Sequence, residues 1–426
     1  MPANPSPPAV CQRPMHDWYL LCGRPLHAAP EGVDRTPACL MHSRDPQKNW
    51  DEFRQEIKTI LARTSEIHDF SGFVFTGEAD FRIVTFTANA HFDGATFAGV
   101  AHFTGATFTK NAGFLVATFT AEADFVDAKF NSHADFRHAT FAGSAFFSRA
   151  TFTGAADFFR ATFTQSLSFV EVQFDGIADF TETRFEKPTA VLFYRVNEQD
   201  NGLKARLRTC LLEGVRFEDV HWHRQGGRLL LQDELDLDMN RTGVTHELVA
   251  HAYRRLVNNF EKSRQYQLAE ECIVGEMEMR RRGETFSVLN AYRWLSNYGS
   301  SYLLPLLWLG VLAFVIFPVL FGSFGLHRTD QRATTAAATA ATEAFPPVPP
   351  PMISWRNAWT FANRGHELWQ TWKTMALATL ETATLQRNPY AVPATGAGRV
   401  VQIVMVLTMP GLLALFLFAL RRRFRR

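Results

Sequence analysis

Phenylalanine returns at regular intervals over a long stretch of this chain. From Phe70 to Phe185, 22 phenylalanines are spaced alternately by five and six residues, so the pattern has a period of eleven. In 16 of the 22 cases an alanine stands two residues earlier, and Asp, Thr, Arg and Lys fill many of the other positions. Residues two apart point to the same side of a β-strand. The pattern therefore predicts short strands whose Ala and Phe side chains face inward together.

A helical interpretation of the same positions does not fit. Eleven residues match about three turns of helix, but an Ala and a Phe two positions apart would lie on opposite helix faces. Strands stacked at this period would instead place the phenylalanines above one another in internal ladders. The ladder residues that we single out are Phe81, Phe86, Phe92, Phe97, Phe103, Phe108, Phe114 and Phe119.

The repeated Ala-x-Phe unit, as in "ADF" and "ATF", resembles the pentapeptide-repeat family, in which a small residue is followed two places later by Leu or Phe. The resemblance covers about 120 residues. It implies a right-handed quadrilateral β-helix in which four units form one coil, here about 22 residues long. Residues 211–222 are similar to a last partial coil, which we expect to close the far end of the rod.

The outward positions of the repeats carry mixed charge. Residues 66–187 contain 15 acidic and eight basic residues, and the whole chain has a formal net charge of +2. Some pentapeptide-repeat proteins mimic DNA, but that requires a more strongly and regularly acidic surface, and the balance does not favour nucleic-acid binding either. His91, His133 and His138 have no nucleophile or carboxylate at a catalytic spacing. The sequence therefore predicts a protein that is not an enzyme.

Three of the five cysteines lie near the N-terminus, and the third forms a C-x2-H motif with a histidine. Four soft ligands within 32 residues suit tetrahedral zinc in a closed, structural site. Two alternatives stay open: reduced cytosolic thiols need no metal, and His16 or His27 could replace one member of the set. The predicted ligands of a possible structural zinc ion are Cys11, Cys22, Cys39 and His42.

After the repeats, two amphipathic segments predict a helical hairpin. Residues 244–262 carry apolar side chains at helical spacing, and the second segment places Tyr266, Ala269, Ile273 and Met277 on one face. We expect these faces to pack against each other.

Two later segments are long and apolar enough to cross a bilayer. Residues 302–324 and 400–420 contain no charge over 23 and 21 residues, and about 20 suffice. Arginines precede the first segment in "MRRR" and follow the second in "RRRFRR", which marks the cytoplasmic side. The N-terminus lacks the basic start and apolar stretch of a secretory signal. We therefore expect a multi-pass protein of the bacterial inner membrane with both termini in the cytoplasm.

The loop between the spans ends in an amphipathic segment, "HELWQTWKTMALATLETATLQRNPY". A span, an outer half-helix and a second span resemble the two-span pore unit of tetrameric cation channels, with Thr382, Thr384 and Arg387 near the filter position. The chain departs from that family because "TATLQRNPY" has no glycine where the filter has T-x-G-Y-G. Alternatively, the segment lies on the outer membrane interface.

These interpretations combine into one hypothesis. The fold class is mainly β with an α-helical membrane part: a quadrilateral β-helix, then a helical hairpin and two transmembrane helices. The predicted domains are 1–65 (Cys/His segment and helix), 66–230 (β-helix with its cap), 231–300 (hairpin and interfacial segment) and 301–426 (membrane domain). The predicted function is a membrane-anchored scaffold for an unknown protein partner. The alternative is a subunit of a homo-oligomeric ion channel that the rod regulates.

Overall fold

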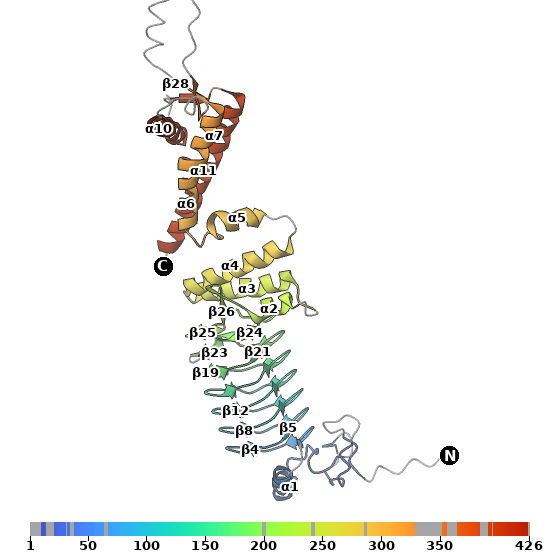
Figure 1. The fold of residues 1–426 in the computed structure, drawn as a ribbon. Helices are drawn as coiled ribbons and strands as arrows, with labels where there is room; N and C mark the ends of the chain where they lie inside the picture. The colour runs from blue at the N-terminus through green and yellow to red at the C-terminus, as the bar shows by residue number, and fades with distance from the viewer. Residues whose placement is uncertain are drawn as a thin grey trace, which may run out of the picture. The chain divides into compact units, whose positions relative to one another are not determined.

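The computed structural model describes residues 10–13, 21–30, 32–34, 38–63, 67–197, 202–239, 243–284, 288–328, 352–355, 364–383, 391–393 and 395–424 (Figure 1). The chain divides into two compact units, Met1–Glu284 and Thr285–Arg426. Each unit is described by itself below.

The first unit is built on a four-sided solenoid of parallel strands. Equivalent residues in successive coils are 22 apart, as in the pairing of Ala90 with Ala112 and of Phe86 with Phe108. The predicted fold class, with about 22 residues per coil, is therefore confirmed.

Four sheets form the sides of the solenoid. The first contains β1 (Ile67–Asp69), β5 (Asn89–His91), β9 (Ala112–Gly113), β13 (Ala134–Asp135), β17 (Ala156–Asp157), β21 (Ile177–Asp179) and β24 (Lys204–Arg206). The second contains β2 (Val74–Phe75), β6 (Thr96–Phe97), β10 (Thr118–Phe119), β14 (Thr140–Phe141), β18 (Thr162–Phe163) and β22 (Arg184–Phe185). The third contains β3 (Ala79–Asp80), β7 (Ala101–His102), β11 (Ala123–Asp124), β15 (Ala145–Phe146), β19 (Leu167–Val170), β23 (Val191–Tyr194) and β25 (Arg216–Glu218). The fourth contains β4 (Thr85–Phe86), β8 (Thr107–Phe108), β12 (Lys129–Phe130), β16 (Thr151–Phe152) and β20 (Gln173–Phe174).

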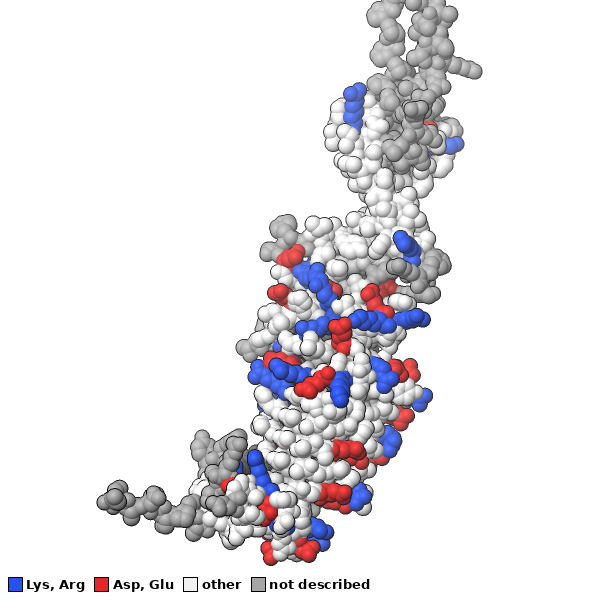
Figure 2. All heavy atoms as spheres, turned by 180° about the vertical axis from the view of Figure 1, so that it is seen from behind, with Lys and Arg blue, Asp and Glu red and all other residues white. Residues whose placement is uncertain are grey.

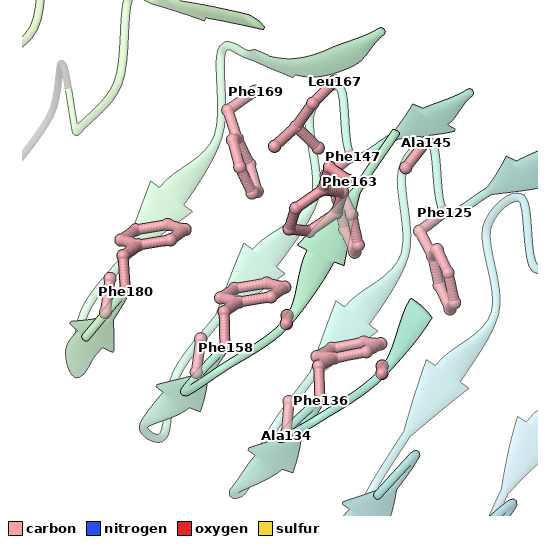
Figure 3. Packing of buried hydrophobic residues seen from close by; sticks show 14 of the residues in the cluster. Phe125, Ala134, Phe136, Ala145, Phe147, Phe158, Phe163, Leu167, Phe169 and Phe180 are labelled. Atoms are coloured by element: carbon pink, nitrogen blue, oxygen red, sulfur yellow. The ribbon is translucent and has the colours of Figure 1, made fainter. Parts of the chain in front are cut away.

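Phenylalanine rings fill the interior of the solenoid. Phe125 stacks between Phe103 and Phe147, with ring centroids 4.8 and 4.9 Å away. It also meets Phe136 of the neighbouring ladder edge-to-face at 5.6 Å. Figure 3 shows one row with Phe125, Phe147 and Phe169 and a second row with Phe136, Phe158 and Phe180. Edge-to-face contacts of this kind add to the stabilisation from apolar burial, which is about 1.5–3 kcal/mol for a large side chain. The core is therefore built mainly of stacked Phe rings, with Ala side chains beside them.

Every second phenylalanine is followed by a tight turn through a left-handed residue. At the first such turn of the third sheet, Ile83 has φ 54° and the Val84 N–H donates to the Phe81 carbonyl at 3.2 Å. A left-handed conformation is disfavoured by roughly 1–2 kcal/mol for a residue with a Cβ. The Ile83 N–H nevertheless donates to Thr104 O of the next coil at 2.9 Å. Hydrogen bonds between coils thus hold the turn in place.

Charged side chains pair across coils on the outside of the solenoid. Arg149 contacts Asp127 at 2.7 Å and Arg160 contacts Glu182 at 2.6 Å, in each case one coil of 22 residues away. Figure 2 shows acidic and basic side chains next to one another on one face of the rod. Ion pairs between coils thus neutralise part of the acidic surface.

An N-terminal module covers the first coil. The Val74 N–H donates to the Met41 carbonyl at 2.8 Å, and Lys48 Nζ donates to the Val74 carbonyl. Helix α1 (Trp50–Ala62) places Phe53 edge-on against Phe75 at 5.4 Å. The module thus supplies hydrogen-bond partners for the backbone, and an apolar contact for the core, at the open end of the solenoid.

The last coil is covered by helices α2 (Gln232–Asp238), α3 (His246–Lys262) and α4 (Tyr266–Gly283). A short hairpin of β26 (Arg224–Gln225) and β27 (Arg228–Leu229) precedes these helices in the sequence. The insertion before the last coil begins with a 3₁₀ turn, η1 (Pro188–Ala190). Asn259 of α3 donates to the Leu212 and Val215 carbonyls at 2.6 and 2.7 Å, and Phe260 packs edge-on against Trp222 at 6.0 Å. The helices therefore close the end that we expected residues 211–222 to close alone.

The buried face of α4 differs from the prediction. Tyr266 is exposed, whereas Cys272, Glu276 and Met279 are buried together with Ala269. Arg254 and Arg280 both contact Glu276 at 2.8 Å, so a buried ion-pair group replaces an apolar residue in the interface. A pattern search for apolar positions cannot find a face that includes a neutralised glutamate.

The second unit contains the two apolar helices. The first runs through α6 (Leu303–Val311), a π-helical turn η2 (Leu312–Ile316) and α7 (Phe317–Phe324), and the second is α11 (Gly396–Phe424). Both are long and apolar enough to cross a membrane. Helix α5 (Val288–Ser296) precedes them, α10 (Arg364–Ala383) lies between them in sequence, and β28 (Leu326–Arg328), β29 (Met352–Ile353) and β30 (Ala391–Pro393) form a small antiparallel sheet.

Helix α10 packs beside the middle and end of the first apolar helix. Pro318 has no N–H to donate to the Phe314 carbonyl four residues earlier, and the helix widens to a π-turn at this point. The indole N–H of Trp372 donates to that carbonyl at 3.1 Å. Met375 and Thr379 of α10 are fully buried. Helix α10 thus lies against the apolar helices, and Trp372 supplies the Phe314 carbonyl with a hydrogen-bond donor that Pro318 cannot provide.

Candidate functional site

The clearest cluster of chemically active side chains lies in the N-terminal module. Its four ligand atoms, the Sγ atoms of Cys11, Cys22 and Cys39 and a ring nitrogen of His42, all lie within 4.8 Å of one another. The distances are 3.6 Å from Cys22 Sγ to Cys39 Sγ and 3.3 Å from Cys39 Sγ to His42 Nδ1. A tetrahedron with metal–sulfur bonds of about 2.3 Å has edges of about 3.8 Å. The cluster could therefore hold a metal ion.

Backbone pairing brings the first two cysteines together. The Cys11 N–H donates to the Arg24 carbonyl at 2.9 Å, and the Gly23 N–H donates back to the Cys11 carbonyl at 3.0 Å. Gly23 has φ 65°, so a residue without a Cβ suits this tight return of the chain. The two segments thus form a small antiparallel ribbon that places Cys11 and Cys22 on the same side.

A turn presents the other two ligands. The His42 and Ser43 N–H groups both donate to the Cys39 carbonyl, at 3.1 and 2.9 Å. This one-turn geometry explains the C-x2-H spacing, because side chains three residues apart then point the same way. The sequence spacing alone predicted this half of the cluster.

The far nitrogen of His42 is bound to the solenoid. His42 Nε2 lies 3.0 Å from the carbonyl oxygen of Ser71, and a carbonyl can only accept, so Nε2 carries the proton. Nδ1 is then left as the lone-pair nitrogen that faces the three sulfur atoms. Metal-binding histidines usually donate their other N–H to a carboxylate or a carbonyl in this way. The arrangement also ties the cluster to the first coil.

The electrostatic setting favours a thiolate at Cys22, whereas the hydrogen bond with Cys22 and burial raise the pKa of Cys39. The hydrogen bond with Cys39 is the main reason why the pKa of the Cys22 thiol is held well below its ordinary value, and contacts with His42 and Arg24 lower it further. Arg24 Nη1 lies 3.4 Å from Cys22 Sγ, and its Nη2 contacts Glu56 at 2.9 Å. Metal ions bind the thiolate form of cysteine.

The remaining predicted site residues fall elsewhere. His27 contacts Asp45 at 3.0 Å and is not a member of the cluster, and His16 lies outside the described residues. Thr382 is in the last turn of α10, but its side chain is not described, and Thr384 and Arg387 lie outside the described residues. The suggestion that these three residues line a pore therefore stays a prediction.

Two contributors were missed by sequence reasoning. Ser71 acts through a backbone carbonyl that no residue type reveals, and Arg24 was not considered although it stands two residues after Cys22. A basic residue next to a cysteine of a soft-ligand set is a signal that could have identified Arg24.

The geometry thus defines a parallel β-solenoid capped by a module with a Cys₃His cluster and followed by two apolar helices. Comparison with family models matches residues 92–140, 117–162 and 136–184 to the family described as pentapeptide repeats (9 copies). The match confirms that the rod is built of pentapeptide repeats, as the Ala-x-Phe unit indicated. No curated protein matched the chain, and no solved structure matched it.

Proposed function

We propose that this protein is a non-enzymatic scaffold anchored in a membrane, with the pentapeptide-repeat rod as a rigid surface for a protein partner. The observation that carries the proposal is that the chain combines a rod with a filled interior and two apolar helices. The rod interior is filled with Phe and Ala, so only its outer surface can bind another molecule. Two apolar helices elsewhere in the chain supply an anchor.

The apolar helices are better suited to lipid than to a protein core. Only 22% of the most apolar window of each helix is buried. Side chains such as Val315, Ile403 and Leu407 are exposed in the isolated chain. Exposed apolar surface on this scale marks an interface with a membrane or another protein. We place both chain ends in the cytoplasm, because arginines flank the helices on that side.

Site-specific photo-cross-linking tests the scaffold proposal. A photoreactive residue would replace Arg82, Lys110 or Asn131 on the rod, with Val404 of α11 as the control position facing lipid. We expect one discrete cross-linked protein from positions on one rod face, and none from position 404. The scaffold proposal would be rejected if no rod position gave a defined product.

We further propose that the Cys₃His cluster binds a structural zinc ion. Three thiols and one imidazole are a soft, four-ligand set that leaves no position for substrate. Such a site would hold the N-terminal module against the open end of the rod, since His42 also binds Ser71 O. In zinc-finger peptides the apparent binding free energy is about 10–16 kcal/mol.

Metal analysis of the purified full-length protein tests the zinc site. We expect about one zinc per chain in the wild type, in keeping with a four-ligand site. Cys39→Ser should lose it, whereas Cys210→Ser should keep it, because Cys210 lies buried in the solenoid and away from the cluster. Equal zinc content in both variants would disprove the assignment.

A second candidate function is a subunit of a homo-oligomeric channel. The packing of α10 against the first apolar helix, through Trp372 and the Phe314 carbonyl, favours it. Conductance in planar bilayers, together with the mass of the detergent-solubilised particle, tests it. A monomeric protein without conductance would eliminate the channel and leave the scaffold proposal intact.

A further inference from the structure

A cavity of about 490 Å³ lies between the N-terminal module and the first sheet of the rod. Its walls come from residues far apart in the sequence: Arg13 and Arg44 of the module, and strands β5, β9 and β13 with the turns that follow them. Ligand pockets in proteins typically have volumes of about 300–1,000 Å³. The size of this cavity is therefore suitable for a small organic molecule.

The floor of the cavity includes one glycine of the first sheet. In the outward column of the first sheet, Gly113 pairs with His91 of the coil before and with Asp135 of the coil after. A Cβ at position 113 would lie 2.7 Å from Asp93 Oδ1 and 3.1 Å from His91 Nδ1. Glycine inside a strand often marks a place where another group approaches closely. Here the missing side chain leaves room for the Asp93 carboxylate and the His91 ring beside the strand.

The carboxylates around this space are already engaged. Asp135 Oδ2 contacts Arg137 Nη2 at 2.6 Å. Asp93 accepts from the Leu115 N–H at 3.0 Å and lies 3.3 Å from His91 Nδ1. Both acidic groups thus have partners within the rod.

Two arginines of the module line the cavity without an ion-pair partner among the described residues. Within the described part of the chain, neither Arg13 nor Arg44 forms an ion pair, and Arg13 Nε is buried without a hydrogen-bond partner. Their backbones are held in place: the Cys22 N–H donates to Arg13 O, and the Arg44 N–H donates to Asp34 at 2.8 Å. A buried donor without a partner is unfavourable by about 1–3 kcal/mol. An anionic ligand would supply that partner.

The wall beside the glycine is apolar. Leu115 and Val116 occupy the turn positions that Arg137 and His138 occupy one coil later, and Val116 is 55% exposed. The Val116 side chain, with φ 58° at its backbone, does not belong to the solenoid core. It offers a surface for the apolar body of a ligand.

We propose that this cavity binds a small organic anion, with a phosphate or carboxylate group on Arg13 and Arg44 and an apolar body on Leu115 and Val116. Guanidinium groups recognise both kinds of anion through paired hydrogen bonds. The rod would then be a ligand-binding domain as well as a scaffold. Because the site lies wholly within the first unit, it does not depend on membrane insertion.

Isothermal titration of the full-length protein in detergent tests this binding site. The probes are 1-naphthyl phosphate and 1-naphthoate, with inorganic phosphate and 1-naphthol as the separate head and body. We expect saturable binding, one molecule per chain, for at least one naphthyl anion, and at least tenfold weaker binding of both fragments. The stronger of the two anions identifies the preferred head group. An absence of saturable binding by both naphthyl anions would overturn the proposal.

Matched variants locate the binding. Arg13→Ala with Arg44→Ala, Gly113→Asn and Val116→Asp should each weaken binding at least tenfold, and circular dichroism would verify folding. The controls are Arg82→Ala, an exposed arginine of another face, and Ile83→Asp, an exposed apolar residue in the same left-handed turn position as Val116. Control variants should bind as the wild type does. If the cavity variants bound equally well, the observed binding would lie elsewhere and the site would be wrong.

Discussion

The two units of this chain distribute their apolar side chains in opposite ways. In the rod, the ladder phenylalanines are almost completely buried and charged side chains cover the outside. In the second unit, apolar residues such as Ile403 and Leu407 are 61% and 71% exposed within the uncharged stretch 400–420. Burial of apolar surface drives folding only where the alternative is water. The proposed membrane anchor would account for this difference, because it places the two parts of the chain in different solvents.

Backbone hydrogen bonding also differs between the units, because the rod is built of strands and the second unit mainly of helices. Rod strands donate to the neighbouring coil, as the Phe103 N–H does to Asp124 O at 2.7 Å. A helix in lipid must satisfy its backbone internally or through a neighbouring side chain. Trp372 supplies such a side chain at the Phe314 carbonyl, opposite Pro318. The comparison leads to four predictions.

The largest effect is expected inside the rod. Phe147 and Phe146 are adjacent on the chain, but Phe147 is fully buried between Phe125 and Phe169 whereas Phe146 points outward. Phe147→Ala should lower the free energy of unfolding by about 3–5 kcal/mol, because it leaves a cavity. Phe146→Ala should lower it by less than half as much. Urea unfolding followed by circular dichroism checks this, and equal losses would contradict the alternation of inside and outside.

The second-largest effect is expected when lysine replaces an exposed apolar residue, because a membrane span disfavours the charge whereas the rod surface tolerates it. Val315, in the middle of the first apolar helix, and Ile83, on the rod, are both exposed in the isolated chain. Val315→Lys should disfavour membrane insertion by about 3 kcal/mol, whereas Ile83→Lys should leave the rod folded and the chain in the membrane. The measurement is the inserted fraction in a glycosylation-reporter assay. Insertion that was unaffected by the lysine at 315 would argue against a membrane span.

A smaller effect on stability is expected where Trp372 of α10 donates to the Phe314 carbonyl near Pro318. Trp372→Phe removes the donor to the Phe314 carbonyl and should lower stability by about 0.5–1.5 kcal/mol. Trp369→Phe is the matched control, because Trp369 stacks on Trp372 at 5.1 Å and is more than half exposed. Thermal unfolding in detergent gives the comparison. Identical midpoints for the two variants would mean that the hydrogen bond contributes nothing.

The smallest effect is expected on the rod surface. Arg149→Ala breaks the exposed pair with Asp127 and should change stability by less than about 1 kcal/mol, since water screens such pairs. The difference from the wild type should shrink further in high salt. A loss as large as that of Phe147→Ala would show that the rod depends on its surface charges.

The fold could be predicted in detail because its cause is local and repeated. Each Ala-x-Phe unit indicates which side chains face inward, and 22 phenylalanines with alternating spacing define the period. The ends of the rod could not be predicted as well. Asn259 and Gln265 reach the carbonyls of the last coil as hydrogen-bond donors, and a polar residue gives no sign in the sequence of which carbonyl it will meet.

The candidate metal site was predictable in composition but not in assembly. The C-x2-H motif determines how Cys39 and His42 lie, because they share one turn. The approach of Cys11 to His42, 3.5 Å across 31 positions of sequence, depends on the ribbon around Gly23. The exclusion of His27 depends on its pairing with Asp45. Spacing alone had left that histidine as an alternative.

The amino-acid sequence by itself determined the solenoid, its 22-residue coil and the two apolar helices, because periodic burial and long uncharged runs act over short distances along the chain. Tertiary structure decided the rest: the closure of the Cys₃His cluster, the covering of the last coil by α3, and the cavity above Gly113. Each of these joins residues that are neighbours only after the coils have stacked. Their energies depend on distances and partners in space, which no linear pattern contains.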